Sequence, residues 1–151
     1  MKSLKRILLV EDSARDAEMT IEALDEYRLA NAVTHCRDGS DALDYLFGRG
    51  AHAGRASEAP AVVLLDLKMP KVDGMEVLRQ MKAHPLLKVI PVVVMTSSRE
   101  ESDLVSSYQL GVNAYVVKPV GFQDFVEAVK LLGGFWAIVN EPPPPNEGGR
   151  A

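Results

Sequence analysis

Acidic side chains follow two apolar runs of the sequence, at the point where each run stops. Glu11 and Asp12 come directly after Ile7–Val10, and Asp66 follows Ala61–Leu65. Continuous aliphatic runs are typical of strands that are buried on both faces of a parallel sheet. Because the carboxyl ends of such strands meet at one edge, where α/β sheets hold their ligands, we expect these carboxylates to converge. Such oxygens suit a hard cation such as Mg²⁺, with Asp12 and Asp66 as direct ligands and Glu11 behind them or bridged by water.

Two further polar residues stand at the ends of later strand-like runs. Thr96 follows 91–95, and Lys118 follows 114–117 and precedes Pro119. An ammonium group offsets the repulsion between clustered carboxylates, and a hydroxyl can donate a hydrogen bond to a phosphoryl oxygen. Taken singly, a Thr at a strand end is more often structural, and a lone Lys-Pro step is weak evidence for a site. Their order along the chain predicts a site for a divalent cation and a phosphoryl group.

Strand-like runs alternate with helix-like segments along the chain. We expect strands at 7–10, 32–36, 61–65, 90–95 and 114–117, and helices at 14–27, 41–47, 75–81, 100–109 and 122–132. Three pairs have the form of a capping box at a helix start: Ser13 with Asp16, Asp73 with Glu76, and Ser98 with Glu101. The alternation predicts an α/β fold, a doubly wound five-stranded parallel sheet with helices on both faces.

Composition and charge exclude several functional classes. The 151 residues are 47% hydrophobic and 25% charged, as expected of one globular domain. The net charge of -4 argues against binding to nucleic acid or to an anionic membrane surface. The apolar runs are too short for a membrane span, and the first is too short for a signal peptide, so we expect a cytoplasmic protein. The single Cys36 excludes an intramolecular disulfide, and no zinc-ligand spacing accompanies it in the sequence.

Two segments depart from the compact pattern. Residues 48–60 form a long Gly/Ala-rich connection that we interpret as a solvated loop, although Arg49, His52 and Arg55 could contact a partner. Helical spacing of apolar residues continues from Phe122 to Val139. Gly133 and Gly134 leave open whether 133–139 extend the last helix or form a strand. We therefore expect a domain over 1–140 and a disordered Pro/Gly-rich tail over 141–151. An apolar patch of Phe135, Trp136 and Ile138 predicts a homodimer.

The motifs together resemble the receiver domains of bacterial two-component response regulators. They are ILLVED at 7–12, LLDLKMP at 64–70 with Asp73-Gly74, VMTS at 94–97 and Lys118-Pro119, and the similarity spans roughly 5–132. The resemblance implies a flavodoxin-like sheet with strand order 2-1-3-4-5. It makes Asp66 the phosphoacceptor, Thr96 and Lys118 the groups that bind the phosphoryl, and Tyr115 the switch aromatic. It makes Glu11, Asp12 and Asp66 the Mg²⁺ site, with the backbone carbonyl of Lys68.

The resemblance also implies a function. The chain is then a stand-alone signalling phosphoacceptor rather than an enzyme, phosphorylated by a sensor histidine kinase and dimerising through its fourth helix, fifth strand and last helix. The long loop and the Phe135-Trp136 extension are similar to single-domain regulators that pair with bacteriophytochrome-type kinases. Three alternatives stay open. The first is a flavin or nucleotide carrier, but this sequence has no loop that could cradle a phosphate. The second is a phosphatase-type hydrolase, which would need a general acid at the position that Lys68 occupies. The third is a receiver that acts only as a scaffold.

Overall fold

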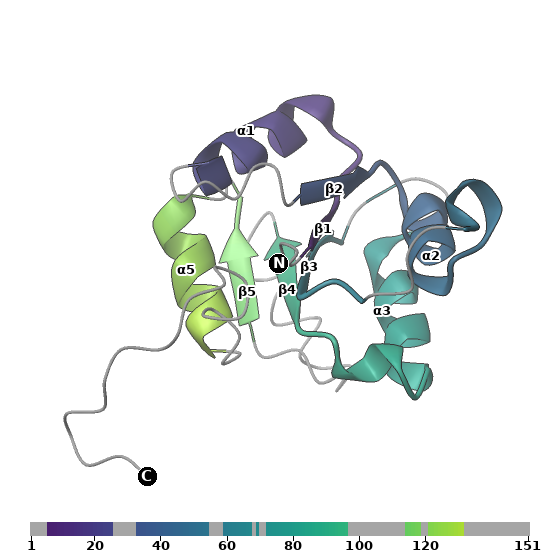
Figure 1. Ribbon diagram of the computed structural model, residues 1–151. Coiled ribbons are helices and arrows are strands. Elements are labelled where there is room, and N and C mark those ends of the chain that lie inside the picture. The colour runs from purple at the N-terminus through teal and green to yellow at the C-terminus, as the bar shows by residue number, and fades with distance from the viewer. Residues whose placement is uncertain are drawn as a thin grey trace, which may run out of the picture.

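The computed structural model describes residues 6–25, 33–54, 59–67, 69, 72–96, 114–118 and 121–131. Its centre is a five-stranded parallel sheet in the order β2-β1-β3-β4-β5 (Figure 1). The strands are β1 (Ile7–Val10), β2 (Val33–Cys36), β3 (Val62–Asp66), β4 (Val92–Thr96) and β5 (Ala114–Val117). The predicted fold class and strand order are confirmed. All four pairings are parallel, so every strand ends at the same edge of the sheet.

Helices cover both faces of this sheet. Helices α1 (Ala14–Asp25) and α5 (Phe122–Leu131) pack on one face, and α2 (Gly39–Phe47) and α3 (Gly74–Ala83) pack on the other (Figure 1). Successive strand residues alternate between the two cores, so Leu64 contributes to the first and Leu65 to the second. Because both faces are covered, β1, β3 and β4 are buried throughout. This burial explains why these strands read as unbroken apolar runs.

Side chains cap three of the helices at the edge where the strands end. The backbone N–H of Asp16 donates to Ser13 Oγ at 3.1 Å, and that of Glu76 donates to Asp73 Oδ1 at 3.0 Å, as the capping boxes predicted. Helix α2 starts at Gly39, two residues before the predicted start, because Asp38 Oδ1 accepts from the backbone N–H of Asp41 at 2.8 Å. These caps keep the βα connections short.

Residues 48–54 of the connection after α2 are mostly exposed, as expected of the predicted solvated loop, but they follow a defined turn. Gly48 turns the chain back with a φ of 66°, and a 3₁₀ turn, η2 (Gly50–His52), follows. His52 then packs edge-on against Tyr45 with ring centroids 5.2 Å apart. A second 3₁₀ turn, η3 (Leu87–Val89), precedes β4, which therefore begins at Val92 and not at residue 90.

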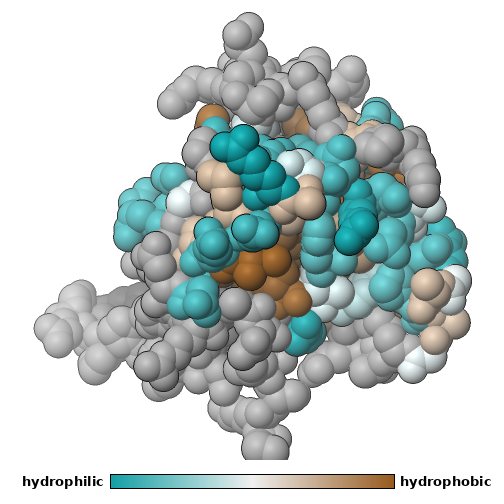
Figure 2. Space-filling model, turned by 90° about the horizontal axis from the view of Figure 1, so that it is seen from above, coloured by the Kyte–Doolittle hydropathy of each residue, from teal (hydrophilic) through white to brown (hydrophobic). Residues whose placement is uncertain are grey.

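Several expectations fall on residues outside the described ranges. They are the helix at 100–109 with its Ser98 cap, the segment 133–139 with its apolar patch, and the tail at 141–151. Among the described residues, no helix combines the length and apolar character that crossing a membrane requires. Figure 2 shows one face of the molecule, on which a small central group of hydrophobic residues is surrounded by hydrophilic ones.

Candidate functional site

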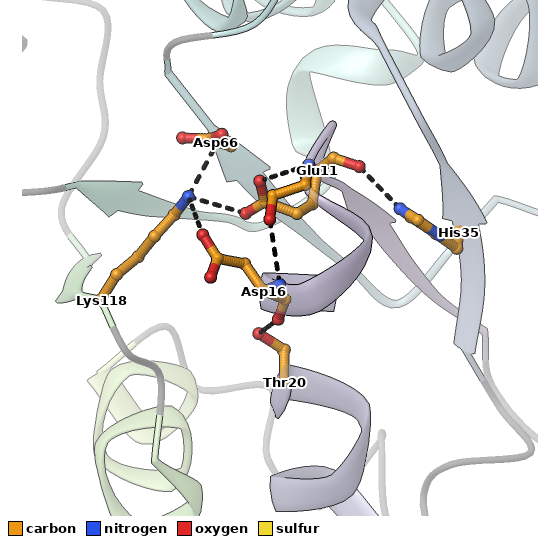
Figure 3. A network of polar contacts seen from close by, with 7 residues as sticks. Glu11, Asp16, Thr20, His35, Asp66 and Lys118 are labelled. Carbon is orange, nitrogen blue, oxygen red and sulfur yellow. Dashed lines mark hydrogen bonds and ion pairs between the residues drawn. The ribbon is translucent and has the colours of Figure 1, made fainter. Parts of the chain in front are cut away.

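The ends of β1, β3 and β5 bring an ammonium group and three carboxylates together (Figure 3). Lys118 Nζ lies 2.8 Å from Glu11 Oε1, 3.3 Å from Asp66 Oδ2 and 3.3 Å from Asp16 Oδ2. Asp66 is the last residue of β3, Glu11 follows β1, and Lys118 follows β5. The parallel topology therefore assembles residues that are 107 positions apart in the sequence (118 less 11).

Glu11 is fixed from several sides. Its side chain is 1% exposed, and its Oε2 accepts from the backbone N–H of Ser13 at 3.1 Å. Its backbone N–H donates to the carbonyl of Cys36 at 3.0 Å, and its carbonyl lies 2.7 Å from His35 Nε2. A buried carboxylate with this many restraints is preorganised, so its charge acts from a fixed point beside Asp66.

Burial and charge set the protonation of the site. Burial, and next the negative charge of Glu11, raise the pKa of Asp66 from 3.8 to about 7, while Lys118 opposes them. Burial alone would lower the pKa of Lys118. However, its hydrogen bond to Glu11 and the charges of Asp66 and Glu11 raise that pKa above its usual value. The ammonium therefore stays charged, whereas burial and the charge of Glu11 disfavour the ionised form of Asp66.

The acidic residues fit a divalent cation. One oxygen from each of Glu11, Asp12 and Asp66 lies within 4.8 Å of the other two. Carboxylate oxygens are the donors that hard cations prefer, and exposed Asp12 leaves room for water ligands. The raised pKa of Asp66 is a second sign of fit, because a cation at this point would relieve the repulsion.

Thr96 lies beside this group at the end of β4. Its side chain is fully buried, and its Oγ1 has no hydrogen-bond partner within the part of the chain that the structure describes. Asp66 pairs in register with Met95, so Thr96 stands one residue beyond that pairing. A buried hydroxyl without a partner costs free energy and is usually explained by a ligand or water.

Tyr115 lies on β5, opposite Val94 in the β4–β5 register. Alternation along a strand puts Val94 and Thr96 on the same face of the sheet, so Tyr115 and Thr96 are diagonal neighbours. Tyr115 is partly exposed and lines a surface hollow of about 300 Å³ with Asp124 and Glu127 of α5.

Gly74 lets α3 begin directly against the site. A Cβ atom at this position would overlap the backbone carbonyl oxygen of Asp66, and the Gly74 N–H donates to the carbonyl of Leu67 at 3.0 Å. Only glycine permits this close approach of two backbones. The Asp73-Gly74 pair of the sequence therefore caps α3 and sets the position of the Asp66 backbone.

The structure brings together Glu11, Asp12, Asp66 and Lys118, as the sequence predicts. Lys68 and Pro119 lie outside the described residues. Asp16 was not predicted to be a partner of Lys118, because the capping box gave it a structural role. In the structure, Glu11 and not Asp16 accepts the hydrogen bond from the backbone N–H of Ser13. The Asp16 carboxylate instead accepts from the Lys118 ammonium (Figure 3). The sequence feature that could have indicated this contact is the position of Asp16 in the first helical turn after the acidic pair.

A groove of about 320 Å³ runs from the site along α1. It is lined by Asp12 and by the α1 residues Ala14, Ala17, Glu18, Ile21 and Glu22, with His35 and Arg37 beyond β1. Of the α1 residues that line it, Ala17 is buried, Ile21 is half-buried, and Ala14, Glu18 and Glu22 are exposed.

The sequence matches a known family over most of its length. The sequence model of the response regulator receiver domain aligns with residues 7–130. The chain belongs to this family. The receiver domain is a signalling domain and not a conventional enzyme, and its family implies a histidine kinase as a partner. The family assignment of the sequence analysis is confirmed.

Solved structures of other response regulators are similar to this receiver. The bacteriophytochrome response regulator AtBRR is 58% identical, with a TM-score of 0.87, and the match covers 93% of this chain and 100% of that one. The phosphorylated cyanobacterial phytochrome response regulator RcpA is 40% identical, with a TM-score of 0.71, and the match covers 89% and 95%. The Mn²⁺-bound form of the response regulator Rcp1 is 37% identical, with a TM-score of 0.69, and the match covers 94% and 99%.

Proposed function

We propose that Asp66 accepts a phosphoryl group from a phosphohistidine of a sensor histidine kinase. The observation that carries this proposal is the position of the Asp66 carboxylate. It ends a central strand, lies 3.3 Å from the Lys118 ammonium, and belongs to the acidic group that fits a cation. An oxygen of Asp66 attacks phosphorus as the phosphorus–nitrogen bond breaks, and the imidazole nitrogen leaves with the electron pair. The product is an acyl phosphate on Asp66.

The surrounding side chains position the group and balance its charge. Lys118 turns from the carboxylate of Asp66 to an oxygen of the phosphoryl group, while Glu11 keeps the ammonium in place. Thr96 donates its hydroxyl to a second phosphoryl oxygen, which gives that buried group a partner. Phosphoryl transfer needs little more than this positioning and charge balance.

Mg²⁺ is the cation that we propose for the acidic group, with Asp12 and Asp66 as ligands, Glu11 nearby and the Lys68 carbonyl as a further ligand. When bound, Mg²⁺ supplies positive charge that favours ionised Asp66 and offsets the charge of the transferred group. The Mn²⁺-bound form of Rcp1 supports a divalent ion at a related site.

Thr96 and Tyr115 form the proposed switch. Movement of Thr96 toward the phosphoryl group vacates space on the face of the sheet that it shares with Tyr115, and the ring turns inward. Their diagonal register supports this coupling. The change alters the surface made by the fourth helix, β5 and α5, a two-state element of the kind that phosphorylation biases.

The proposed kinase is of the bacteriophytochrome type, and the proposed assembly is a homodimer through the surface of the fourth helix, β5 and α5. Support for the kinase comes from the 58% identity to the bacteriophytochrome response regulator AtBRR. Support for the dimer comes from Val117 of β5, which is 47% exposed on that surface. Light scattering at high micromolar concentration tests the assembly, and a monomer with solvent-exposed Trp136 fluorescence would contradict it.

Phosphotransfer decides the central proposal. The purified protein is incubated with Mg²⁺ and either a phosphorylated kinase or acetyl phosphate, and intact-mass spectrometry counts the phosphoryl groups. The wild-type chain takes up one group, Asp66→Asn takes up none, and the matched control Asp44→Asn behaves as wild type. Uptake by Asp66→Asn would refute the assignment of the phosphoacceptor. Profiling against several kinases then identifies the one that transfers fastest.

A further inference from the structure

Three side chains with sulfur, oxygen and nitrogen donors meet beside α2, separate from the acidic group. Cys36 is the last residue of β2, Asp41 lies in the first turn of α2, and His52 ends η2. The donor atoms of these three side chains all lie within 4.8 Å of one another. Cys36 thus has two potential co-ligands that no spacing in the sequence reveals.

The fold brings these residues together by reversing the chain after α2. The left-handed turn at Gly48 sends η2 back alongside the helix, so that the segment following α2 lies beside it (Figure 1). His52 reaches the amino end of α2, where its Nε2 lies 2.8 Å from Asp41 Oδ1. The Tyr45 ring supports His52 edge-on and limits its orientation.

The chemistry of this donor set differs from that of the acidic site. A thiolate, an imidazole nitrogen and a carboxylate oxygen suit a borderline-soft cation such as Zn²⁺, whereas Mg²⁺ prefers oxygen donors alone. Three protein ligands leave one tetrahedral position for water. The partly exposed His52 and Asp41, at 24% and 36% of their side chains, give that position access to solvent.

Cys36 closes the site from the protein interior. Its side chain is fully buried among apolar residues of the α2 and α3 face, and its backbone carbonyl is held by the N–H of Glu11 at 3.0 Å. The sulfur therefore lies on the buried side of the group, while His52 and Asp41 are partly exposed. On binding, the Cys36 thiol releases its proton to solvent. In the neutral imidazole of His52, the Nε2 proton that Asp41 accepts shifts to Nδ1, so that Nε2 and the Asp41 carboxylate both become free to bind the cation.

We propose that Cys36, Asp41 and His52 form a second cation site, of the Zn²⁺ class, which clamps η2 to the end of β2. The competing interpretation is that His52 and Asp41 form only an ion pair and that Cys36 serves only as a small core residue. The two interpretations differ in whether sulfur enters the coordination of a bound ion.

Cobalt spectroscopy separates them, because Co²⁺ replaces Zn²⁺ and reports on sulfur ligands. The full chain is titrated with Co²⁺ in the presence of saturating Mg²⁺, which occupies the acidic group. We expect a thiolate-to-cobalt charge-transfer band that saturates at one Co²⁺ per chain and disappears on addition of Zn²⁺. Oxygen-only coordination at the acidic group gives no such band. Absence of the band from the wild-type protein would overturn the proposal.

Matched variants assign the ligands. Cys36→Ser should abolish the band, and His52→Gln and Asp41→Asn should each weaken Co²⁺ binding by about tenfold or more. Asp66→Asn and His84→Gln, which change the acidic group and an unrelated histidine, should leave the band and the affinity unchanged. If Cys36→Ser does not fold, the two partly exposed positions still decide the question. A band that survives Cys36→Ser, or binding that neither His52→Gln nor Asp41→Asn weakens, would also overturn the proposal.

Discussion

Asp66 combines two properties that work against each other. The residue is 5% exposed and sits beside Glu11, which destabilises its charged form, yet the proposed reaction needs the charged form as nucleophile. A pKa of about 7 leaves the carboxylate largely ionised at slightly alkaline pH. The protein thus keeps a reactive group in an environment that costs stability, as is common at functional sites.

This cost gives Asp66 a specific effect on the pH dependence of stability. The pKa is 3.8 when unfolded and about 7 when folded, so between these values the folded state holds a proton that the unfolded state releases. The free energy of unfolding therefore falls as pH rises from about 4 to about 7, and the loss is complete above that range. Asp66→Asn removes this dependence. In chelator at pH 8 we expect the variant to be more stable than wild type by on the order of 2 kcal/mol.

Urea unfolding at pH 5 and pH 8, with metal removed from both proteins, measures the effect. The wild-type protein should lose stability between the two pH values, and Asp66→Asn should lose less. Asp44→Asn serves as the control, because Asp44 lies near the surface in an ion pair with Arg49. Equal pH slopes for wild type and Asp66→Asn would contradict the argument.

Lys118 offsets the repulsion between the clustered carboxylates when no cation is bound. Its ammonium contacts Glu11, Asp16 and Asp66 together. Lys118→Met removes the positive charge that favours the ionised form of Asp66, so the pKa of Asp66 should move above 7. We expect a loss of stability of about 1–3 kcal/mol at pH 8 in chelator, because two buried carboxylates lose their counter-charge.

Saturating Mg²⁺ should restore much of the stability that Lys118→Met loses, since the cation supplies the missing charge. Lys118→Arg keeps a charge but not the compact ammonium, and should lie between the two. Thermal unfolding with and without Mg²⁺ compares the three proteins. A variant that is destabilised equally in both conditions would show that Lys118 acts through packing alone.

At the scale of the element, the start of α3 is a tightly constrained connection, because it lies directly against the backbone of Asp66. Gly74→Ala introduces a Cβ atom where the Asp66 carbonyl lies, so either α3 or the end of β3 must move. We expect a loss of about 2 kcal/mol or more, by the overpacking mechanism, together with slower phosphoryl uptake because Asp66 shifts.

Gly121 provides the matched control for this substitution. It stands just before α5, as Gly74 stands at the start of α3, but a Cβ atom there meets only Asp124 Oδ2 at 3.4 Å. Gly121→Ala should therefore change stability and uptake little. Chemical denaturation and the rate of phosphorylation by acetyl phosphate give both readouts. Equal effects of the two alanine substitutions would show that backbone contact at Gly74 is unimportant.

The elements also show what the sequence could and could not predict. Strand β1 was predictable because burial on both faces leaves an unbroken apolar run, and it has the predicted bounds. Strand β5 also has its predicted bounds, although it lies at the sheet edge with Tyr115 half-buried and Val117 exposed. Helix α2 was predicted too short, because the capping role of Asp38 depends on local backbone geometry. The return of η2 along α2 was missed for a related reason. A left-handed Gly48 reverses the chain, and composition alone suggests only a loop.

The site was predictable to the extent that strand order places residues. Each of Glu11, Asp66 and Lys118 ends a strand, and a parallel sheet collects strand ends at one edge. Contacts made by helix side chains were not predictable in this way. The Asp16 carboxylate could face either its own helix terminus or the site, and only the position of Lys118 decides between them. The cluster of Cys36, Asp41 and His52 was likewise hidden, because it depends on the path of η2.

At the scale of the whole molecule, the sheet couples cation binding to the stability of the fold. The proposed Mg²⁺ ligands come from the ends of β1 and β3, which are hydrogen-bonded neighbours at the centre of the sheet. A cation that binds only the folded chain therefore stabilises the domain by mass action, at about 1.4 kcal/mol for each tenfold increase above its dissociation constant. We expect the melting temperature to rise steadily with Mg²⁺ at pH 8.

This stabilisation should weaken as the pH falls below 7, because protonated Asp66 is a poorer ligand and its pKa is about 7 without the cation. Asp12→Asn and Asp66→Asn should each reduce the Mg²⁺-dependent rise, while Asp41→Asn, at the separate Cys36 cluster, should retain it. Thermal scans over a Mg²⁺ series at pH 6 and pH 8 compare the four proteins. A rise that is the same at both pH values, or that persists in Asp12→Asn and Asp66→Asn alike, would place the cation elsewhere. The ends of β1 and β3 would then lose their proposed role in phosphoryl transfer.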